Sequence, residues 1–429
     1  MHATNGPTIF VHHSIILIIM KENKALIITL TVIRIFVGVL FIFSGLIKAN
    51  DPSGLAYKMG EFFEVWAKEG YTPSLMHWLN NYSLLFSILM IAFEIVAGVA
   101  LIIGYRFKLF AYLILLLTIF FTFLTGYALY SGNIKECGCF GDCIKLQANE
   151  SFMKDLILLA LLLILVLFRK RIKQSFGNAT ATGVMIVSLI LSFWMQWYVL
   201  KHLPFKDCLA YRVGNNILKE MTPGKDYVPA KFETILTYEK DGVKKDFNTQ
   251  NFPWQDTTWK FVDSKSTEVS PALNEPPIKD FAIGDFDGND QTQTILNYPG
   301  YVFVVFIKDV KEAHTENISA LQKLIADAKQ SKVPVIAISA SNDIETSAFS
   351  KKHQLDLSFF TIDATVCKTA MRSNPGIMLL QAGTIKGKWS YADYPDLASL
   401  KLDYSQNQSP LFMPVMPENV IPDSSAVQN

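Results

Sequence analysis

Five long apolar segments in the first half of the chain constrain its fold more than any other feature. They lie at residues 25–47, 83–103, 109–130, 152–168 and 181–200. A helix needs about 20 apolar residues to cross a bilayer, with a lower limit of about 17. A buried helix in a soluble protein could explain one such run, but five in succession predict an α-helical membrane bundle.

The composition changes near Leu200, where the apolar runs end. Half of all residues are hydrophobic and only 18% are charged, giving a mean hydropathy of +0.25. These averages are too apolar for a soluble protein and too polar for a membrane protein throughout. We therefore expect a lipid-embedded bundle followed by a water-soluble domain. The net charge of +1 gives no indication of nucleic acid as a partner.

Basic residues predict the orientation of the bundle. They cluster before the first segment, between the second and third, and between the fourth and fifth, at Lys21, Lys24, Arg106, Lys108, Arg169, Lys170, Arg171 and Lys173. If five spans alternate, all these residues share one side, and short basic loops mark the cytoplasm. The prediction is a bacterial inner (plasma) membrane protein with five spans, a cytoplasmic N-terminus and a periplasmic or extracytoplasmic C-terminal domain.

Residues 1–24 form an N-terminal extension before these spans. Residues 9–20 are apolar, but the run is short and His12-His13 interrupts it. It could be the apolar region of a signal peptide. We favour a start at Met20.

Three of the five cysteines, Cys137, Cys139 and Cys143, lie in the loop between the third and fourth segments. This loop is predicted to lie outside the cytoplasm, where disulfides persist. Cys139 and Cys143 are four residues apart with Gly141 between them, so their Cα atoms can approach within the ~7 Å that a bridge requires. We predict a resting Cys139–Cys143 disulfide, because Cys137 and Cys139 are too close in sequence for an unstrained bridge.

Several chemical roles are open to these sulfurs. Thiol–disulfide exchange needs a thiolate and a second sulfur within reach, and the loop offers both. The alternatives are one inert bridge with a spare thiol, or a metal site with Cys208 as a fourth thiolate. Cys208 could also pair with the odd loop cysteine or remain a lone surface thiol. We favour redox exchange at Cys137, Cys139 and Cys143, with Cys208 as a further redox partner and no metal.

Two charged residues, Arg34 and Glu94, lie well inside predicted spans. Charges inside a membrane are costly and normally paired. Each is nine residues from the expected inner end of its span, which places both about 13 Å deep. Matched depth on neighbouring helices predicts an intramembrane ion pair, either structural or proton-carrying.

Short motifs in the bundle resemble the DoxX family of small four-helix membrane proteins. They are Arg34, Ser44-Gly45-x-x-Lys48, Asp51-Pro52 and Glu94-x-x-x-Gly98. The loop motif Cys137-Gly138-Cys139-Phe140-Gly141 resembles the related MauE branch. The resemblance covers roughly residues 28–168, and it assigns residues 25–170 to a four-helix domain, with 171–202 as an added fifth helix.

The resemblance implies a redox role. MauE is linked to disulfide formation in a secreted dehydrogenase subunit, together with a thioredoxin-like partner. Vitamin K epoxide reductase-like enzymes share the plan of a thiol pair beside a quinone pocket in four helices, so quinone is the implied cofactor. This chain departs from the pattern in its fifth span and its third loop cysteine, and nothing in it points to methylamine.

Residues 203–270 are expected to form a small extracytoplasmic β-rich region and linker. Asp241-Gly242 lies between two extended runs, 231–239 and 243–248, which is a hairpin signal. Residues 264–277 are rich in Ser, Thr and Pro and are typical of a linker.

Residues 271–400 alternate buried strands with helices, and their order resembles a thioredoxin-like α/β domain followed by a tail at 401–429. Pro375 matches the position of that fold's cis-proline. The Cys-x-x-Cys expected after the first buried strand is missing, because residues 307–314 contain no cysteine. Cys367 lies in a predicted helix and is interpreted as a packing residue.

The sequence thus predicts a DoxX/MauE-like membrane protein carrying a thioredoxin-like domain without its dithiol. It would exchange disulfides with an extracytoplasmic thiol/disulfide protein partner and pass electrons to a membrane acceptor such as quinone, which would make it a thiol–disulfide oxidoreductase. The alternative is a non-catalytic membrane scaffold whose thioredoxin-like domain binds partner proteins.

Overall fold

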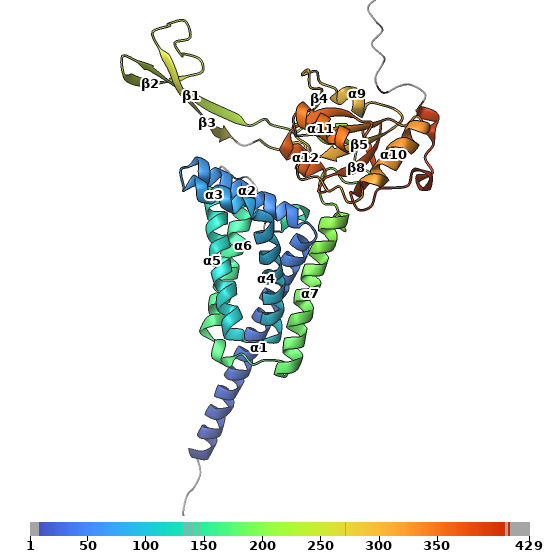
Figure 1. Ribbon diagram of the computed structural model, residues 1–429. Coiled ribbons are helices and arrows are strands. Elements are labelled where there is room, and N and C mark those ends of the chain that lie inside the picture. The colour runs from blue at the N-terminus through green and yellow to red at the C-terminus, as the bar shows by residue number, and fades with distance from the viewer. Residues whose placement is uncertain are drawn as a thin grey trace, which may run out of the picture. The chain divides into compact units, whose positions relative to one another are not determined.

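The computed structural model describes residues 8–131, 134, 138, 140–144, 146–270, 272–407 and 411. The chain divides into two compact units (Figure 1). One comprises Met1–Leu209 with Trp389–Asp393, and the other comprises Ala210–Lys388 with Tyr394–Asn429. An α-helical bundle and a mixed α/β domain follow one another in the chain, as predicted.

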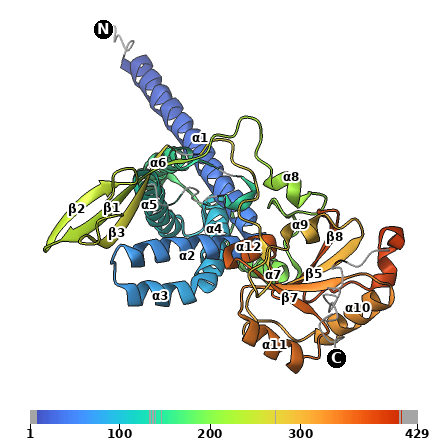
Figure 2. The ribbon, with the colours of Figure 1, turned by 90° about the horizontal axis from the view of Figure 1, so that it is seen from above.

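The bundle consists of long helices with two shorter ones across one end (Figure 1). The helices are α1 (Thr8–Ala49), α2 (Pro52–Lys68), α3 (Pro73–Asn81), α4 (Ser83–Ile103), α5 (Phe107–Ser131), α6 (Ala148–Leu167) and α7 (Asn178–His202), with 3₁₀ turns at Gly141–Cys143 and Arg169–Arg171. Helix α1 packs mainly on α4, and α5 packs on α6. Figure 2 shows α2 and α3 side by side.

Glycines allow α1 and α4 to approach closely. A Cβ on Gly98 would lie 2.8 Å from the Gly38 carbonyl oxygen, and one on Gly38 would lie 2.9 Å from the Gly98 carbonyl oxygen. Small residues at helix crossings are the usual means of tight packing in membranes, where no hydrophobic force drives helices together. Helices α1 and α4 are therefore closely packed at Gly38 and Gly98.

Four described helices are long and apolar enough to cross a membrane. They are Lys24–Ala49, Ser83–Ile103, Phe107–Ser131 and Asn178–His202. Helix α6, the fourth predicted span, has 20 residues but carries Glu150, Lys154 and Asp155 in its first turns. These charges shorten its continuous apolar stretch.

The second unit opens with a short helix, α8 (Ile217–Met221), and a three-stranded antiparallel sheet of order β2-β1-β3. Its strands are β1 (Lys231–Lys240), β2 (Val243–Asn248) and β3 (Lys260–Ser270). The predicted hairpin is confirmed, with Asp241 and Gly242 both at positive φ in the turn. The linker prediction was wrong for its first half, since residues 264–270 pair with β1. Polar and β-branched side chains suit a sheet that is mostly exposed to solvent.

The remainder is a six-stranded sheet of order β4-β7-β6-β5-β8-β9 with helices between its strands. The elements are β4 (Ile283–Gly284), α9 (Thr292–Leu296), β5 (Tyr301–Ile307), α10 (Ile318–Gln330), β6 (Val335–Ser339), α11 (Asp343–Lys352), β7 (Ser358–Ile362), α12 (Ala364–Ala370), β8 (Gly376–Gln381) and β9 (Thr384–Ser390). Strands β5, β6 and β7 are parallel and β8 is antiparallel to β5. This order agrees with the thioredoxin-like prediction.

Candidate functional site

The bundle encloses a cavity of about 840 Å³. Helices α1, α2, α4, α5 and α6 all contribute to its wall, and most of the lining is aliphatic or aromatic. The bulky lining residues include Phe41, Phe62, Phe63, Trp66, Phe86, Phe93, Phe120 and Phe121. Because α2 packs across the end of the bundle through buried Phe62, it forms part of this wall. The apolar face of α2 thus covers one end of the cavity.

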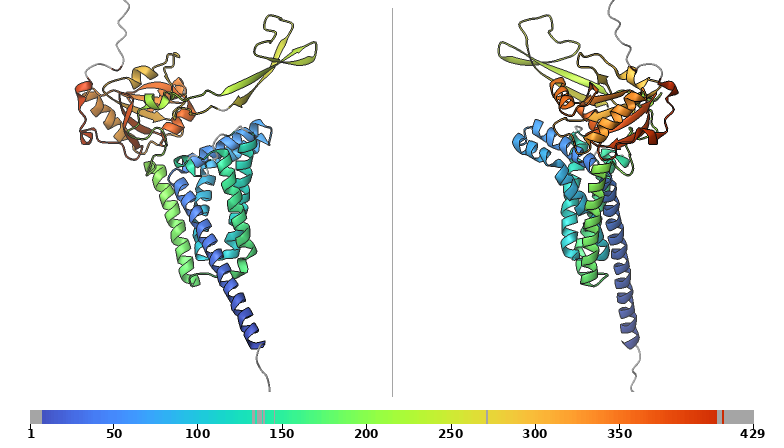
Figure 3. Two further views of the ribbon diagram at one scale, coloured as in Figure 1. Left: turned by 180° about the vertical axis from the view of Figure 1, so that it is seen from behind. Right: turned by 45° about the vertical axis from the view of Figure 1, so that its right-hand side comes forward.

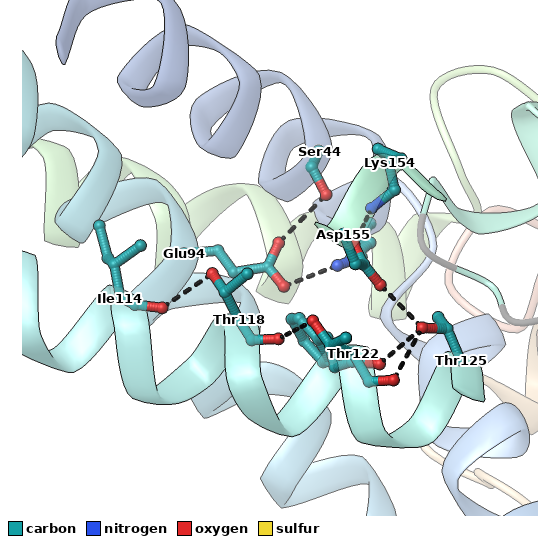
Figure 4. Close-up of polar contacts among 10 residues, drawn as sticks. Ser44, Glu94, Ile114, Thr118, Thr122, Thr125, Lys154 and Asp155 are labelled. Atoms are coloured by element: carbon teal, nitrogen blue, oxygen red, sulfur yellow. Dashed lines mark hydrogen bonds and ion pairs between the residues drawn. The ribbon is translucent and has the colours of Figure 1, made fainter. Parts of the chain in front are cut away.

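Charged residues interrupt the apolar wall at Lys58, which is partly exposed, and at two places where a carboxylate is buried. At the first, the Lys48 ammonium lies 2.6 Å from Glu94 Oε1 and both side chains are buried, with 4% and 1% exposed. Ser44 Oγ donates to Glu94 Oε2 at 3.3 Å (Figure 4). The Lys48 ammonium also lies 5.0 Å from the centre of the Phe121 ring.

The predicted Arg34–Glu94 pair was therefore wrong, because Lys48 pairs with Glu94. Arg34 Nη1 instead donates to the Lys173 carbonyl oxygen at 3.1 Å. The same atom would lie 2.9 Å from a Cβ on Gly104, at the far end of α4 from the cysteine loop. The prediction counted the depth of Arg34 from the first apolar residue of its span. Helix α1 extends well beyond the other helices of the bundle, so that residue does not mark the edge of the bundle (Figure 3).

The second charged place is Asp155, which is 2% exposed near the start of α6. Its carboxylate accepts from Lys154 Nζ at 2.5 Å and from Thr125 Oγ1 at 3.1 Å (Figure 4). The Lys154 ammonium lies 5.4 Å from the centre of the Phe140 ring, and Phe140 belongs to the cysteine loop. Lys154 thus joins α6 to that loop beside the cavity.

Sequence reasoning missed the roles of Lys48, Lys154 and Asp155. Lys48 stood at the C-terminal end of the first span, and the charges of α6 stood at the edge of the fourth, where a polar residue is ordinary. Only their convergence on one cavity distinguishes them. A signal was present in the spacing Ser44-x-x-x-Lys48, since residues four apart share a helix face.

The cysteine loop contains a disulfide that differs from the predicted one. Cys143 is bridged to Cys208, with their Cα atoms 4.8 Å apart. The predicted Cys139–Cys143 bridge was wrong, because spacing along the chain says nothing about a sulfur 65 residues away. The bridge ties the loop before α6 to the segment after α7. Asn50, which follows α1, holds the same segment after α7 by exchanging two hydrogen bonds with the backbone of Lys206.

Cys137 and Cys139 lie outside the described residues, and their predicted redox roles stay predictions. Their described neighbours Gly138 and Phe140 both line the cavity. Cys139 therefore lies in the chain between two cavity-lining residues. No cluster of three His, Cys, Asp or Glu side chains able to hold a metal occurs among the described residues.

The thioredoxin-like domain has its cis-proline but no dithiol beside it. The Asn374–Pro375 peptide bond is cis, as predicted for Pro375. The segment after β5 lies against it, because the His314 amide donates to the Asn374 carbonyl oxygen at 2.8 Å and Asn374 Nδ2 donates to the Asp309 carbonyl oxygen. This is where a dithiol would lie, yet no cysteine occurs between Cys208 and Cys367.

Cys367 has the character of a packing residue. Its side chain is 1% exposed in α12, and burial raises the pKa of its thiol to about 12. A thiol that stays protonated is a poor nucleophile.

Comparison with known proteins supports the division of the chain. Residues 26–168 match the family model described as methylamine utilisation protein MauE. Residues 232–270, which span the three-stranded sheet, match a domain of unknown function (DUF8463). Protein TlpB of Flavobacterium psychrophilum is 24% identical over 231 residues, or 51% of this chain and 57% of that protein, so the match spans little more than half of the relative's length. No solved structure matches the chain.

Proposed function

Because residues 26–168 form a MauE-type membrane segment, we propose that this protein is a membrane thiol–disulfide redox protein. Its loop cysteines exchange disulfides with an extracytoplasmic protein and pass electrons to a quinone in the bundle cavity. The observation that carries the proposal is the position of the loop. Gly138 and Phe140, on either side of Cys139, line a large apolar cavity that also holds two buried carboxylates.

The cysteines divide into two pairs. Cys143 is held by Cys208, which leaves Cys137 and Cys139 as the exchanging sulfurs. A bridge between residues so close in the chain is strained and therefore easily reduced. Two thiols of the partner become a disulfide as the Cys137–Cys139 bridge becomes two thiols. Reoxidation of those thiols releases two electrons and two protons, which a quinone bound in the cavity would take up.

The cavity suits such an acceptor. Ligand sites have volumes of about 300–1,000 Å³, mostly apolar walls and a few placed polar groups. Here Lys48 can donate to a ligand oxygen, while Glu94 balances its charge. Asp155 can accept a proton at the α6 side, where Thr125 and Lys154 hold its carboxylate in place. The aromatic wall excludes water and can stack on a flat ring.

We further propose that all five long helices cross the inner membrane of a bacterium, with the N-terminus in the cytoplasm. The basic turns before α5 and after α6 support this orientation. The bridge places Cys143, before α6, and Cys208, after α7, on the same side of the membrane. If α7 crosses the membrane, α6 must cross it in the opposite direction, which supports a membrane crossing by α6. A reporter that works only outside the cytoplasm should be active after Asn429 and inactive after Arg171.

The thioredoxin-like domain is proposed to bind the partner without reacting, because residues 307–314, the segment beside its cis-proline, contain no cysteine. The alternative is that the whole protein is a scaffold without redox chemistry. The missing dithiol supports a purely binding role for the thioredoxin-like domain, but it does not concern the loop cysteines. The redox state of Cys137 and Cys139 separates the two proposals.

The test is alkylation of the full-length protein in intact cells, with mass shifts read on Cys137 and Cys139. We expect a mixture of oxidised and reduced loop that shifts with respiratory state. Cys139→Ser should accumulate a covalent partner adduct that disappears with dithiothreitol, whereas Cys367→Ser should not. A loop whose redox state stays fixed, with no adduct in Cys137→Ser or Cys139→Ser, would refute the redox proposal and favour the non-catalytic scaffold.

A further inference from the structure

The end of the bundle opposite the cysteine loop carries an open groove of about 670 Å³. The turn between α4 and α5, the first two turns of α5 and the segment after α6 form its wall. Its lining residues are Gly104, Arg106, Phe107, Lys108, Leu109, Tyr112, Leu113, Arg169, Ile172 and Gln174. The redox proposal uses none of them.

The polar side of the groove is positively charged. Arg106 and Lys108 are exposed and Arg169 is half-buried. The two guanidinium groups are supported by rings, Arg106 at 5.9 Å from the centre of Tyr105 and Arg169 at 5.7 Å from that of Tyr112. Arg169 Nη1 also donates to the Val166 carbonyl oxygen. The two guanidinium groups are thus held at the groove by contacts within the bundle.

No acidic residue lies among the described residues that line the groove. The sequence has no Asp or Glu in residues 95–135 or 156–206. Helix α5 begins at Phe107, so its positive dipole end lies at the same place. The described charges of the groove lining and the dipole of α5 therefore favour an anion.

The other side of the groove is apolar and belongs to a membrane helix. Leu109, Tyr112 and Leu113 are all more than a third exposed on α5, whose composition and length allow it to cross a bilayer. A free inorganic anion would make no use of this surface. An anion with a hydrocarbon chain would contact both the cationic and the apolar side of the groove.

We propose that the groove binds an anionic glycerophospholipid. Its phosphate lies between Arg106, Lys108 and Arg169, and an acyl chain lies along Leu109 and Leu113. Guanidinium groups match phosphate oxygens with two parallel hydrogen bonds, and basic sites between membrane helices are suited to such headgroups. The lipid would hold the α4–α5 turn to the segment after α6.

The full-length protein in neutral detergent tests this by native mass spectrometry. The probes are dioleoyl phosphatidylglycerol, dioleoyl phosphatidylcholine and glycerol phosphate. We expect the wild type to bind phosphatidylglycerol at least about tenfold more tightly than phosphatidylcholine, and Arg106→Gln/Arg169→Gln to lose that preference. The control Lys170→Gln/Lys173→Gln removes the same charge from exposed residues outside the groove lining, and should keep it.

Lys108→Glu provides a second variant should the double change misfold, because Lys108 is exposed and its replacement breaks no described hydrogen bond. It should weaken phosphatidylglycerol binding by a similar factor. Equal affinity of the wild type for both lipids would overturn the proposal. So would equal losses in the groove and control variants, or binding of glycerol phosphate as tight as that of the lipid.

Discussion

The buried Lys48–Glu94 pair should stabilise the bundle through mutual dependence of its two charges. Lys48→Met leaves the Glu94 carboxylate without its cation, and Glu94→Gln leaves the ammonium without its anion. Both side chains are almost fully buried, so a stranded charge would lose most of its hydration. We expect each single change to destabilise the protein strongly and the double change to recover much of the loss.

The magnitude follows from the geometry. Two unit charges 2.6 Å apart attract by about 6 kcal/mol at an effective dielectric constant of about 20. Desolvation offsets most of this attraction, but removing one partner of a buried pair typically costs about 3–5 kcal/mol. At roughly 2–4 °C per kcal/mol for a domain of this size, each single variant should lose roughly 6–20 °C in Tm.

The assay is thermal unfolding of the full-length protein in one detergent, for the wild type, both single variants and the Lys48→Met/Glu94→Gln double variant. The matched control is the Lys58–Glu61 pair on α2, 2.7 Å apart and partly exposed. Exposed pairs contribute about 0–1 kcal/mol, so its variants should change Tm little. Additive losses at Lys48 and Glu94, or losses no larger than the control's, would refute the reasoning.

Three further predictions test the packing and the cysteines. Gly98→Val should abolish the close α1–α4 contact and lower the amount of folded protein. Gly183→Val on α7 should not, because no atom lies within 4 Å of its added Cβ. The measurement is the yield of monodisperse protein for the two variants. Breaking the Cys143–Cys208 bridge by Cys208→Ala should lower stability by up to about 4 kcal/mol, measured by thermal unfolding, because the bridge closes a long loop. Cys367 should resist iodoacetamide in the folded protein at pH 8 and react after denaturation. Burial raises its pKa to about 12 against a usual value of 9, so below pH 9 the thiol is protonated in both the folded and the unfolded state. As pH rises from 9 towards 12 the unfolded chain loses this proton first, and the fold loses stability.

The sequence by itself determined the two-part architecture. Long apolar runs are not solvated by water, so they predict a membrane bundle even when no contact between helices is known. The thioredoxin-like order was equally readable, because buried parallel strands need continuous apolar residues. The β1–β2 hairpin was readable because an Asp-Gly pair adopts the positive φ that its turn requires. The cis-proline followed from its place in that order. These features depend on local chemistry and on periodicity along the chain.

The site depended on the tertiary structure. Arg34 and Glu94 looked like partners because depth was counted from the ends of apolar runs, but α1 extends beyond the bundle and brings Lys48 level with Glu94 instead. The nearest cysteine in sequence was likewise not the partner of Cys143. The chain passes through α6 and α7 after Cys143, and this brings Cys208 back beside it. Ion pairs and disulfides depend on distances of a few ångströms between remote residues, and helix packing alone sets those distances.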